Sequence, residues 1–441
     1  MTKNYFNYIQ QTFFPYDQKD LDSFLDRLLR NCNICDLGTI AAGTSSITGE
    51  GGSYFYCWLR DASITMIRIQ YILDFDKYEN ILKKYIDFIE FVLSQQNPNG
   101  ISNFGEPKFN LPDGTIYSDS WARPQNDGPA LCALALNIFA LNLINNNQIE
   151  YVKNKLWNKS GGIINKYIDY IINNYNTFTY DLWEEVGNNA FFWNLSTQHI
   201  SLISASVIAL KFSEYELAAK YIEIANIIKN QLKTNYYNGV SLIEASNREY
   251  DVAALYGLLI DYEFNNKFNV SQQIFEPSSY EVAQTVYNLN CIFSEAFPIN
   301  LQDTTNSIPG ILIGRYLGDT YNGGNPWIGS SLNVAYLYYY VAEYINKNGL
   351  PSYDSIVMWL KSINVNTVIK NKEEMAKLLF NAGDCIMARI KFHTNGNDNN
   401  LYEQINKDTG FMLSSQNLTT NYSGIILVIK FRNKLYKLIM E

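Results

Sequence analysis

The stretch Asp127–Ile144, DGPALCALALNIFALNLI, decides the fold class of this chain. Its apolar residues cover nearly every face of a helix instead of one stripe, which is typical of a helix buried on both sides. Pro129 stands in the first turn, where its missing N–H costs no hydrogen bond, so we predict that the helix begins just before it. Such a helix needs a layer of other helices around it.

Amphipathic helices flank this buried segment along the chain. Leu21–Leu29 follows the i, i+3, i+4 spacing with Asp20 as the expected N-cap, and Ile81–Leu93 repeats the pattern up to the breaker NPNG at 97–100. Strand patterns are short and scarce, as in GVSLIEAS from Gly239. Amphipathic helices alternate with more uniformly apolar ones, which predicts an outer ring around an inner ring in one all-α domain over residues 1–441. Further helices are predicted at 162–174, 198–212, 214–234, 249–262, 280–294, 328–347, 352–363, 372–392 and 420–437.

The composition narrows the class of function. Among 441 residues, 47% are hydrophobic and 17% charged, so the chain can bury a large core and does not resemble a disordered protein. A net charge of −9 argues against nucleic acid and acidic membranes as partners, and favours a neutral substrate.

Neither a metal nor a cofactor is expected. Cys32 and Cys35 form the one CxxC motif, but no second ligand pair lies nearby, and His199 and His393 are the only histidines. Free thiols in a reducing compartment explain the cysteines better. We expect His199 to be a hydrogen-bonded structural residue rather than a catalyst.

The amino-terminal segment MTKNYFNYIQQTFFPY has no continuous apolar stretch of the kind found in signal peptides. No run approaches the roughly 18 uninterrupted apolar residues of a membrane span. These features predict a soluble protein in the cytoplasm or another intracellular compartment, without a membrane partner. We also expect a monomer.

Five long connections rich in Gly, Trp and Tyr lie between the predicted helices, and long structured loops are usually functional. Each mixes aromatic rings with carboxylates, arginines or amides, and such a set suits a sugar, because rings stack on C–H faces while planar polar groups bind hydroxyls. The connections are GEGGSYFYCWLRDAS (49–63), NFGEPKFNLPDGTIYSDSWARPQNDGP (103–129), YDLWEEVGNNAFFW (180–193), GRYLGDTYNGGNPW (314–327) and NDNNLYEQINKDTG (397–410).

The sequence favours a catalytic mechanism based on carboxylates, because motifs of other common mechanisms are not present. The chain has no G-x-S-x-G, P-loop or H-E-x-x-H motif. A glycosidase needs one protonated carboxyl as acid and one ionised carboxylate, and an adjacent charge and apolar neighbours raise the pKa of the first. Glu184 and Glu185 fit that need, although a solvated pair of glutamates on a helix is commoner. A pocket is favoured by the flanking aromatics Trp183, Phe191, Phe192 and Trp193.

Beyond these arguments, the chain resembles the glucoamylase family, whose members are inverting exo-acting α-glucosidases with an (α/α)6 barrel. The resemblance spans roughly residues 20–435 and rests on several long blocks in the family's order. These are YFYCWLRDAS (54–63), GEPKFN (105–110), SWARPQNDGPAL (120–131), YDLWEEV with the following FF and QH (180–199), GRYLGDTYNGGNPW (314–327) and YEQ (402–404).

The resemblance implies roles for eleven residues. Glu184 matches the general acid, Glu403 the general base, and Glu185 a neighbour that contacts substrate beyond the scissile bond. Arg60 and Asp61 match the pair that grips the terminal glucose, with Asp61 fixing the angle of the guanidinium. Inversion implies roughly 6.5–9.5 Å between the two catalytic carboxyls. The remaining substrate contacts are Arg315 and the aromatic walls Tyr54, Trp58, Trp121, Trp183 and Trp327.

The chain departs from the family after the general base. The family carries an Asp and a Trp in a DLTWSYA-like helix start, whereas NLTTNYSG here has Asn417 and Thr420 in those places. Starch-binding and linker segments are not seen, so soluble α-glucan such as glycogen or maltooligosaccharide is the expected substrate, cleaved to β-D-glucose. Trehalose or α-1,6-glucan hydrolysis, and a non-catalytic glucan-binding domain, remain alternatives. Glu106 is expected to shape its loop.

Overall fold

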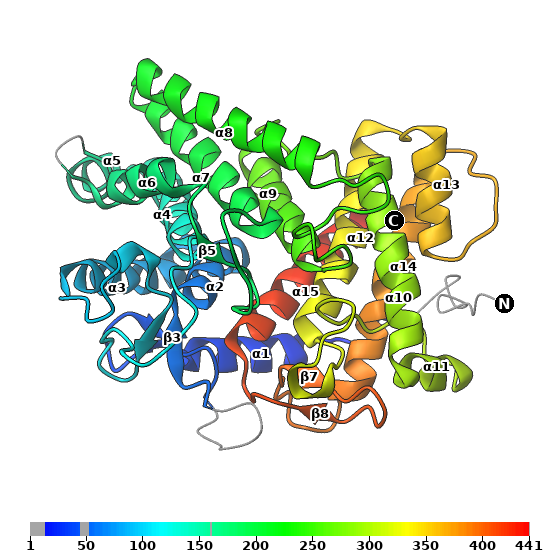
Figure 1. Cartoon of the computed structure of the whole chain (residues 1–441). Coiled ribbons are helices and arrows are strands. Elements are labelled where there is room, and N and C mark those ends of the chain that lie inside the picture. The colour runs from blue at the N-terminus through cyan, green and yellow to red at the C-terminus, as the bar shows by residue number, and fades with distance from the viewer. Residues whose placement is uncertain (1–13, 45–52, 159–160, 441) are drawn as a thin grey trace.

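The computed structural model describes residues 14–44, 53–158 and 161–440, and the described part is predominantly helical (Figure 1). The amino-terminal stretch 1–13 and the first residues of the loop at 49–63 therefore lie outside the described residues. The α-helices are α1 Gln18–Arg30, α2 Leu59–Ile72, α3 Phe75–Ser94, α4 Asp127–Asn145, α5 Ile149–Tyr151, α6 Ile163–Asn174, α7 Phe192–Lys211, α8 Tyr215–Asn235, α9 Ala253–Phe268, α10 Tyr280–Ala296, α11 Pro298–Thr305, α12 Ile328–Asn348, α13 Tyr353–Ser362, α14 Lys372–Thr394 and α15 Thr419–Ile439.

Six helices form a closed inner ring. Each packs on the next in the order α2, α4, α7, α9, α12 and α15, and α15 packs back on α2. In Figure 1, α15 lies between α2 and α12 near the middle of the view. The outer helices alternate with them along the chain, with α1 on α15, α6 on α4, α8 on α7 and α14 on α12. The predicted double ring is therefore confirmed as an (α/α)6 barrel.

Burial explains the apolar character of α4. All but three of its 19 residues are buried, so side chains on every face lie against neighbouring helices. By length and mean hydropathy α4 is the one helix in the described part of the chain that could cross a membrane, yet 89% of its apolar window is buried inside the protein. Its composition is thus that of a helix enclosed by other helices.

The short strands occur as two-stranded antiparallel pairs at the loops. The loops after Gly239 contain only isolated bridges, such as Tyr237 with Leu242, so the strand expected there was wrong. Each of these bridges is a single residue pair, which does not make a strand. The pairs are β1 Cys32–Ile34 with β2 Thr39–Ile40, β3 Tyr56–Trp58 with β4 Lys108–Asn110, β5 Thr179–Tyr180 with β6 Gly187–Asn188, and β7 Gln404–Ile405 with β8 Met412–Leu413.

Two predicted boundaries need correction. The N-cap of α1 is Asp17, whose carboxylate accepts the Asp20 N–H at 2.9 Å, while the Asp20 carboxylate accepts the Asp17 N–H at 3.2 Å. This capping box satisfies two N–H groups, and a single cap at Asp20 would satisfy one. The segment taken as a loop up to Ser63 instead forms β3 and enters α2 at Leu59.

Candidate active site

A cavity of about 670 Å³ lies where the loops meet the amino-terminal ends of the inner helices. Its walls include the first turns of α2, α12 and α15 together with Tyr256 of α9. The structure brings all eleven residues implied by the resemblance into this one cavity: Tyr54, Trp58, Arg60, Asp61, Trp121, Trp183, Glu184, Glu185, Arg315, Trp327 and Glu403.

The two adjacent glutamates lie on the turn between β5 and β6, not on a helix. The Asp181 carboxylate closes this turn by accepting the backbone N–H groups of Glu185 at 2.8 Å and Val186 at 2.9 Å. Glu184 has φ +64°, a left-handed conformation that is costly for a residue with a Cβ. The turn therefore holds Glu184 in a strained conformation that points its side chain apart from that of Glu185.

Glu184 is held by a cation and two neutral donors. It accepts hydrogen bonds from Arg60 at 2.7 Å, Gln125 at 3.0 Å and the Trp121 indole at 2.9 Å. Burial raises the pKa of Glu184 above its ordinary value, Arg60 and the hydrogen bonds lower it in part, and Asp127 raises it further. The net result is a carboxyl that keeps its proton to a higher pH than an exposed glutamate.

Asp61 does not fix the Arg60 guanidinium, contrary to the role implied by the resemblance. Arg60 Nη1 instead donates to Asp127 at 2.8 Å and to Gln125 at 2.9 Å. The reason is geometric: adjacent residues of a helix point in different directions. Burial raises the pKa of Asp61 to about 6, although Arg60 opposes the rise. Asp61 therefore lines the cavity as a carboxyl free to bind a hydroxyl.

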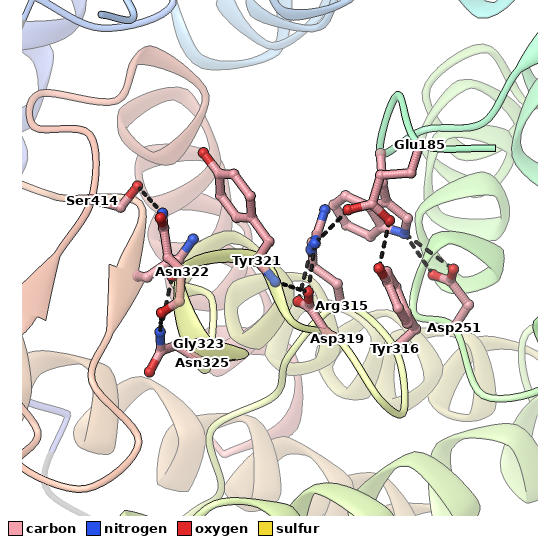
Figure 2. Close-up of polar contacts among 12 residues, drawn as sticks. Glu185, Asp251, Arg315, Tyr316, Asp319, Tyr321, Asn322, Gly323, Asn325 and Ser414 are labelled. Carbon is pink, nitrogen blue, oxygen red and sulfur yellow. Dashed lines mark hydrogen bonds and ion pairs between the residues drawn. The ribbon is translucent and has the colours of Figure 1, made fainter. Parts of the chain in front are cut away.

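Glu185 belongs to a separate ionic network, which Figure 2 shows beside the Arg315 loop. It accepts hydrogen bonds from Arg315 at 2.8 Å, Arg248 at 3.0 Å and the Tyr316 hydroxyl. Burial would raise the pKa of Glu185, but these donors outweigh burial and hold it below its ordinary value. Glu185 is thus kept ionised. We expected Glu185 to help keep Glu184 protonated. Instead, burial and Asp127 are the causes that raise the pKa of Glu184.

Glu403 is nearly fully buried beside β7, and within the described ranges its side chain is bonded to neutral donors alone. Its carboxylate accepts hydrogen bonds from Tyr54 at 2.9 Å, Ser414 at 2.6 Å and Gln404 at 3.0 Å. Burial raises the pKa of Glu403, and these hydrogen bonds lower it in part. The Glu403 carbonyl accepts the Ile328 N–H at 3.1 Å, which ties the residue to the start of α12.

Aromatic rings line much of the cavity, but not all those expected. Trp58 and Trp121 pack 5.8 Å apart between centroids, and Trp183 and Trp327 pack 5.6 Å apart. The expectation that Phe191, Phe192 and Trp193 flank the pocket was wrong, because all three are core residues with at most 1% of their surface exposed. As residues 191–193 enter α7, their side chains pack among the inner helices.

Sequence reasoning missed several polar groups of the site. Lys108 lies over four aromatic rings, at 3.6 Å from the Trp121 centroid and 4.7 Å from that of Trp58, and burial lowers its pKa to about 8. Gln125 and Asp127 stand in the quoted block 120–131, so their place in that block was the available signal. Ser414 had no such signal, since its role depends on the β7–β8 pairing.

The expectations for His199 and Glu106 are met by geometry. Both ring nitrogens of His199 lie within hydrogen-bond distance of backbone carbonyls, at 3.0 Å from Ala225 and 3.1 Å from Gln272, so it is a structural residue. Glu106 is fully buried and holds its loop through Arg123 and two asparagines. Within the described ranges, no group of three His, Cys, Asp or Glu side chains forms a metal site.

The comparisons with known proteins agree with this geometry. Residues 36–430 match the sequence profile described as glycosyl hydrolases family 15. The chain belongs to glycosyl hydrolase family 15. Within the family, it is 29% identical to Glucoamylase 1 of Rhizopus oryzae, over 94% of this chain and 71% of that one.

Solved family 15 structures share the fold. The glucoamylase of Hypocrea jecorina superposes with a TM-score of 0.81 at 23% identity, over 93% of this chain and 71% of that one. The glucoamylase of Saccharomycopsis fibuligera gives a TM-score of 0.79 at 24% identity, over 98% and 99% of the two chains. Family 15 membership thus places the cavity in an enzyme class that hydrolyses glycosidic bonds.

Proposed function

We propose that this protein is a glucoamylase, an inverting exo-acting glucan 1,4-α-glucosidase that releases β-D-glucose from the non-reducing ends of α-glucans. The observation that carries the proposal is the pair of carboxyls in one aromatic cavity, each with a raised pKa and each held by its own partners. A glycosidase needs two such groups in different protonation states. The curated relatives named glucoamylase support the choice of substrate linkage.

Glu184 would be the general acid. Its raised pKa keeps a proton available for the glycosidic oxygen of the leaving sugar. Once that proton has left, the Arg60 guanidinium at 2.7 Å stabilises the carboxylate that forms. Burial thus favours the protonated form before reaction, and Arg60 lowers the cost of the charge that appears during it.

Glu403 would be the general base. When ionised, it accepts hydrogen bonds from Tyr54 and Ser414, which fix its two oxygens in place. It would take a proton from water as that water attacks the anomeric carbon from the face opposite the leaving group. A separation of roughly 6.5–9.5 Å between the two carboxyls, which leaves room for this water, stays a prediction.

Exo action would follow from the depth of the cavity. Asp61 lies on α2 inside the cavity, where its carboxylate can accept a hydroxyl of a terminal glucose. Glu185 and Arg315 lie on the loops, where they can bind the sugar on the other side of the scissile bond. Trp58, Trp121, Trp183 and Trp327 supply apolar faces for the sugar rings.

Glucose release from maltose, maltoheptaose and glycogen by the purified protein tests this proposal. We expect glucose from all three, with the β-anomer appearing first by polarimetry. An α-anomer as first product would refute inversion, and cleavage of trehalose in preference to maltose would assign the cavity to another α-glucoside. Absence of any hydrolysis, with maltose binding retained, would indicate a glucan-binding protein.

A further inference from the structure

Three arginines line the cavity, and two of them are already paired with carboxylates. Arg60 bonds to Asp127 and Glu184, and Arg315 bonds to Glu185 and Asp319. Arg68, the third, donates only to the backbone carbonyl of Thr420, at 3.0 Å from Nη1. Its remaining N–H groups have no protein acceptor among the described residues, although the side chain lines the cavity. Arg68 thus has donors to offer a ligand.

The position of Arg68 places it at the inner end of the cavity. Asp61, Ile64 and Arg68 all line the cavity and follow the i, i+3, i+7 spacing of one helical face. At about 1.5 Å per residue, the Cα of Arg68 lies roughly 10 Å further along α2 than that of Asp61. The long side chain reaches across to the start of α15, where Thr420 accepts its hydrogen bond.

Small residues on α15 make room for the guanidinium. A Cβ on Gly424 would lie 3.1 Å from Arg68 Nη1, so the head group rests directly on this helix. Thr420 also lines the cavity, and its short side chain leaves the guanidinium uncovered where an aromatic residue would shield it. The end of the cavity is consequently a polar surface with hydrogen-bond donors.

Glu263 is the acidic residue near Arg68, but the two side chains form no ion pair. Glu263 of α9 lies under the guanidinium, and its pKa is raised to about 7 by burial although Arg68 lowers it in part. Both side chains line a second cavity of about 20 Å³, together with Tyr256 and Asn333 among others, and it has room for about one water. The Arg68 guanidinium thus keeps N–H groups that no described carboxylate accepts by direct contact.

We propose that Arg68 is a specificity-determining residue that donates a hydrogen bond to a hydroxyl of the non-reducing terminal glucose, on the side away from the scissile bond. The inference rests on the proposed function and goes beyond it by assigning the end of the cavity to a polar contact. A terminal sugar that lacks this hydroxyl leaves the desolvated guanidinium without its acceptor, and such a loss is costly for a charged donor.

The test compares maltose with analogues that lack one hydroxyl, at C-3, C-4 or C-6 of the non-reducing glucose. For the wild type, we expect kcat/KM to fall about 10- to 100-fold for at least one analogue, the range of a hydrogen bond to a charged group. In Arg68→Met, the penalty for one of these analogues should shrink to within about threefold. Arg27→Met is the matched control, because Arg27 bonds to Asn417 and Asp398 outside the cavity.

Each outcome decides the proposal. If Arg68→Met discriminates among the analogues as the wild type does, Arg68 does not contact the sugar and the inference is wrong. If the wild type hydrolyses no maltose, the proposed function fails first. Should Arg68→Met not fold, Thr420→Trp keeps the arginine but covers it with an indole. That variant should lose the same discrimination, and unchanged discrimination would overturn the inference.

Discussion

Glu184 and Glu403 are the same residue type in the same cavity, yet they are held by different means. A cation and two neutral donors surround Glu184, whose side chain is 17% exposed. Glu403 is nearly fully buried and bonded to hydroxyls and an amide, and no cation of the described part of the chain is in direct contact with it. The acid, which should begin protonated, has the arginine, and the base, which should begin ionised, does not.

This arrangement suits the end of the reaction as much as its beginning. Glu184 must become a carboxylate and Glu403 must become neutral as the bond breaks. Arg60 favours the charge that Glu184 acquires, and neutral donors around Glu403 allow it to lose charge without leaving a cation unpaired in a buried site. The partners of each residue therefore match the direction in which its proton moves.

Removing the acid should have the largest effect. Glu184→Gln keeps the shape and the hydrogen bond to Trp121 but has no proton to donate, so we expect kcat to fall about 10⁴-fold. Maltose binding by calorimetry should persist, and circular dichroism should match the wild type. More than about a tenth of wild-type kcat in this variant would assign the acid to another residue.

Removing the base should have the next largest effect. Glu403→Gln leaves an amide that cannot take a proton from water, and we expect a loss of about 10²- to 10³-fold in kcat. Azide, a small anion that can occupy the position of the attacking water, should restore turnover partly in this variant and not in Glu184→Gln. Rescue of both variants to the same degree would remove the distinction between the two roles.

Removing the cation should test why Arg60 lies beside the acid. Arg60→Met is expected to lower kcat/KM about 10- to 100-fold, because Arg60 lowers the pKa of Glu184 and stabilises its carboxylate. Without Arg60 the pKa of Glu184 rises, so the alkaline limb of the kcat/KM profile should move to higher pH. A limb that moves to lower pH would contradict the proposed charge relation.

Removing one neutral donor from the base should have the smallest effect. Ser414→Ala deletes a hydrogen bond that lowers the pKa of Glu403, so the acidic limb should move to higher pH while the alkaline limb stays. We expect kcat/KM at the optimum to fall about two- to tenfold, the range of a neutral hydrogen bond. Movement of both limbs would show that the two carboxyls titrate as a coupled pair.

The helical architecture could be predicted from the sequence because apolar periodicity reports burial. The all-apolar α4 and the amphipathic α3 differ in pattern for the reason that one is enclosed and the other lies on the surface. The helix α2 was not predicted, since its start is a polar motif, LRDAS, that reads as a loop. The N-cap of α2 is Trp58, which makes no side-chain cap, so the usual Ser, Thr, Asp or Asn signal is missing. Trp58, Arg60 and Asp61 line the cavity instead.

The composition of the site was predictable from motifs, whereas the contacts within it were not. Residues such as Glu184 and Arg60 could be named because their blocks are distinctive. That Asp127 rather than Asp61 holds Arg60 depends on which helix face each residue occupies in the closed ring. Spacing along the chain does not reveal distances across a barrel, so Ser414 and Arg68 became visible only when the helices were placed together.

The common direction of the inner helices has an electrostatic consequence. Four of them have a carboxylate at their amino-terminal end. Asp61 is in the first turn of α2, and Asp127 accepts the Gly128 N–H at 2.8 Å in α4. Glu244, from the connection before α9, accepts the Trp193 N–H of α7, and Asp251 accepts the Ala253 N–H of α9. Each helix start carries a partial positive charge. The partial positive charges of these helix starts therefore stabilise the carboxylates beside them. In this way a chain of net negative charge can gather several acidic groups around one site.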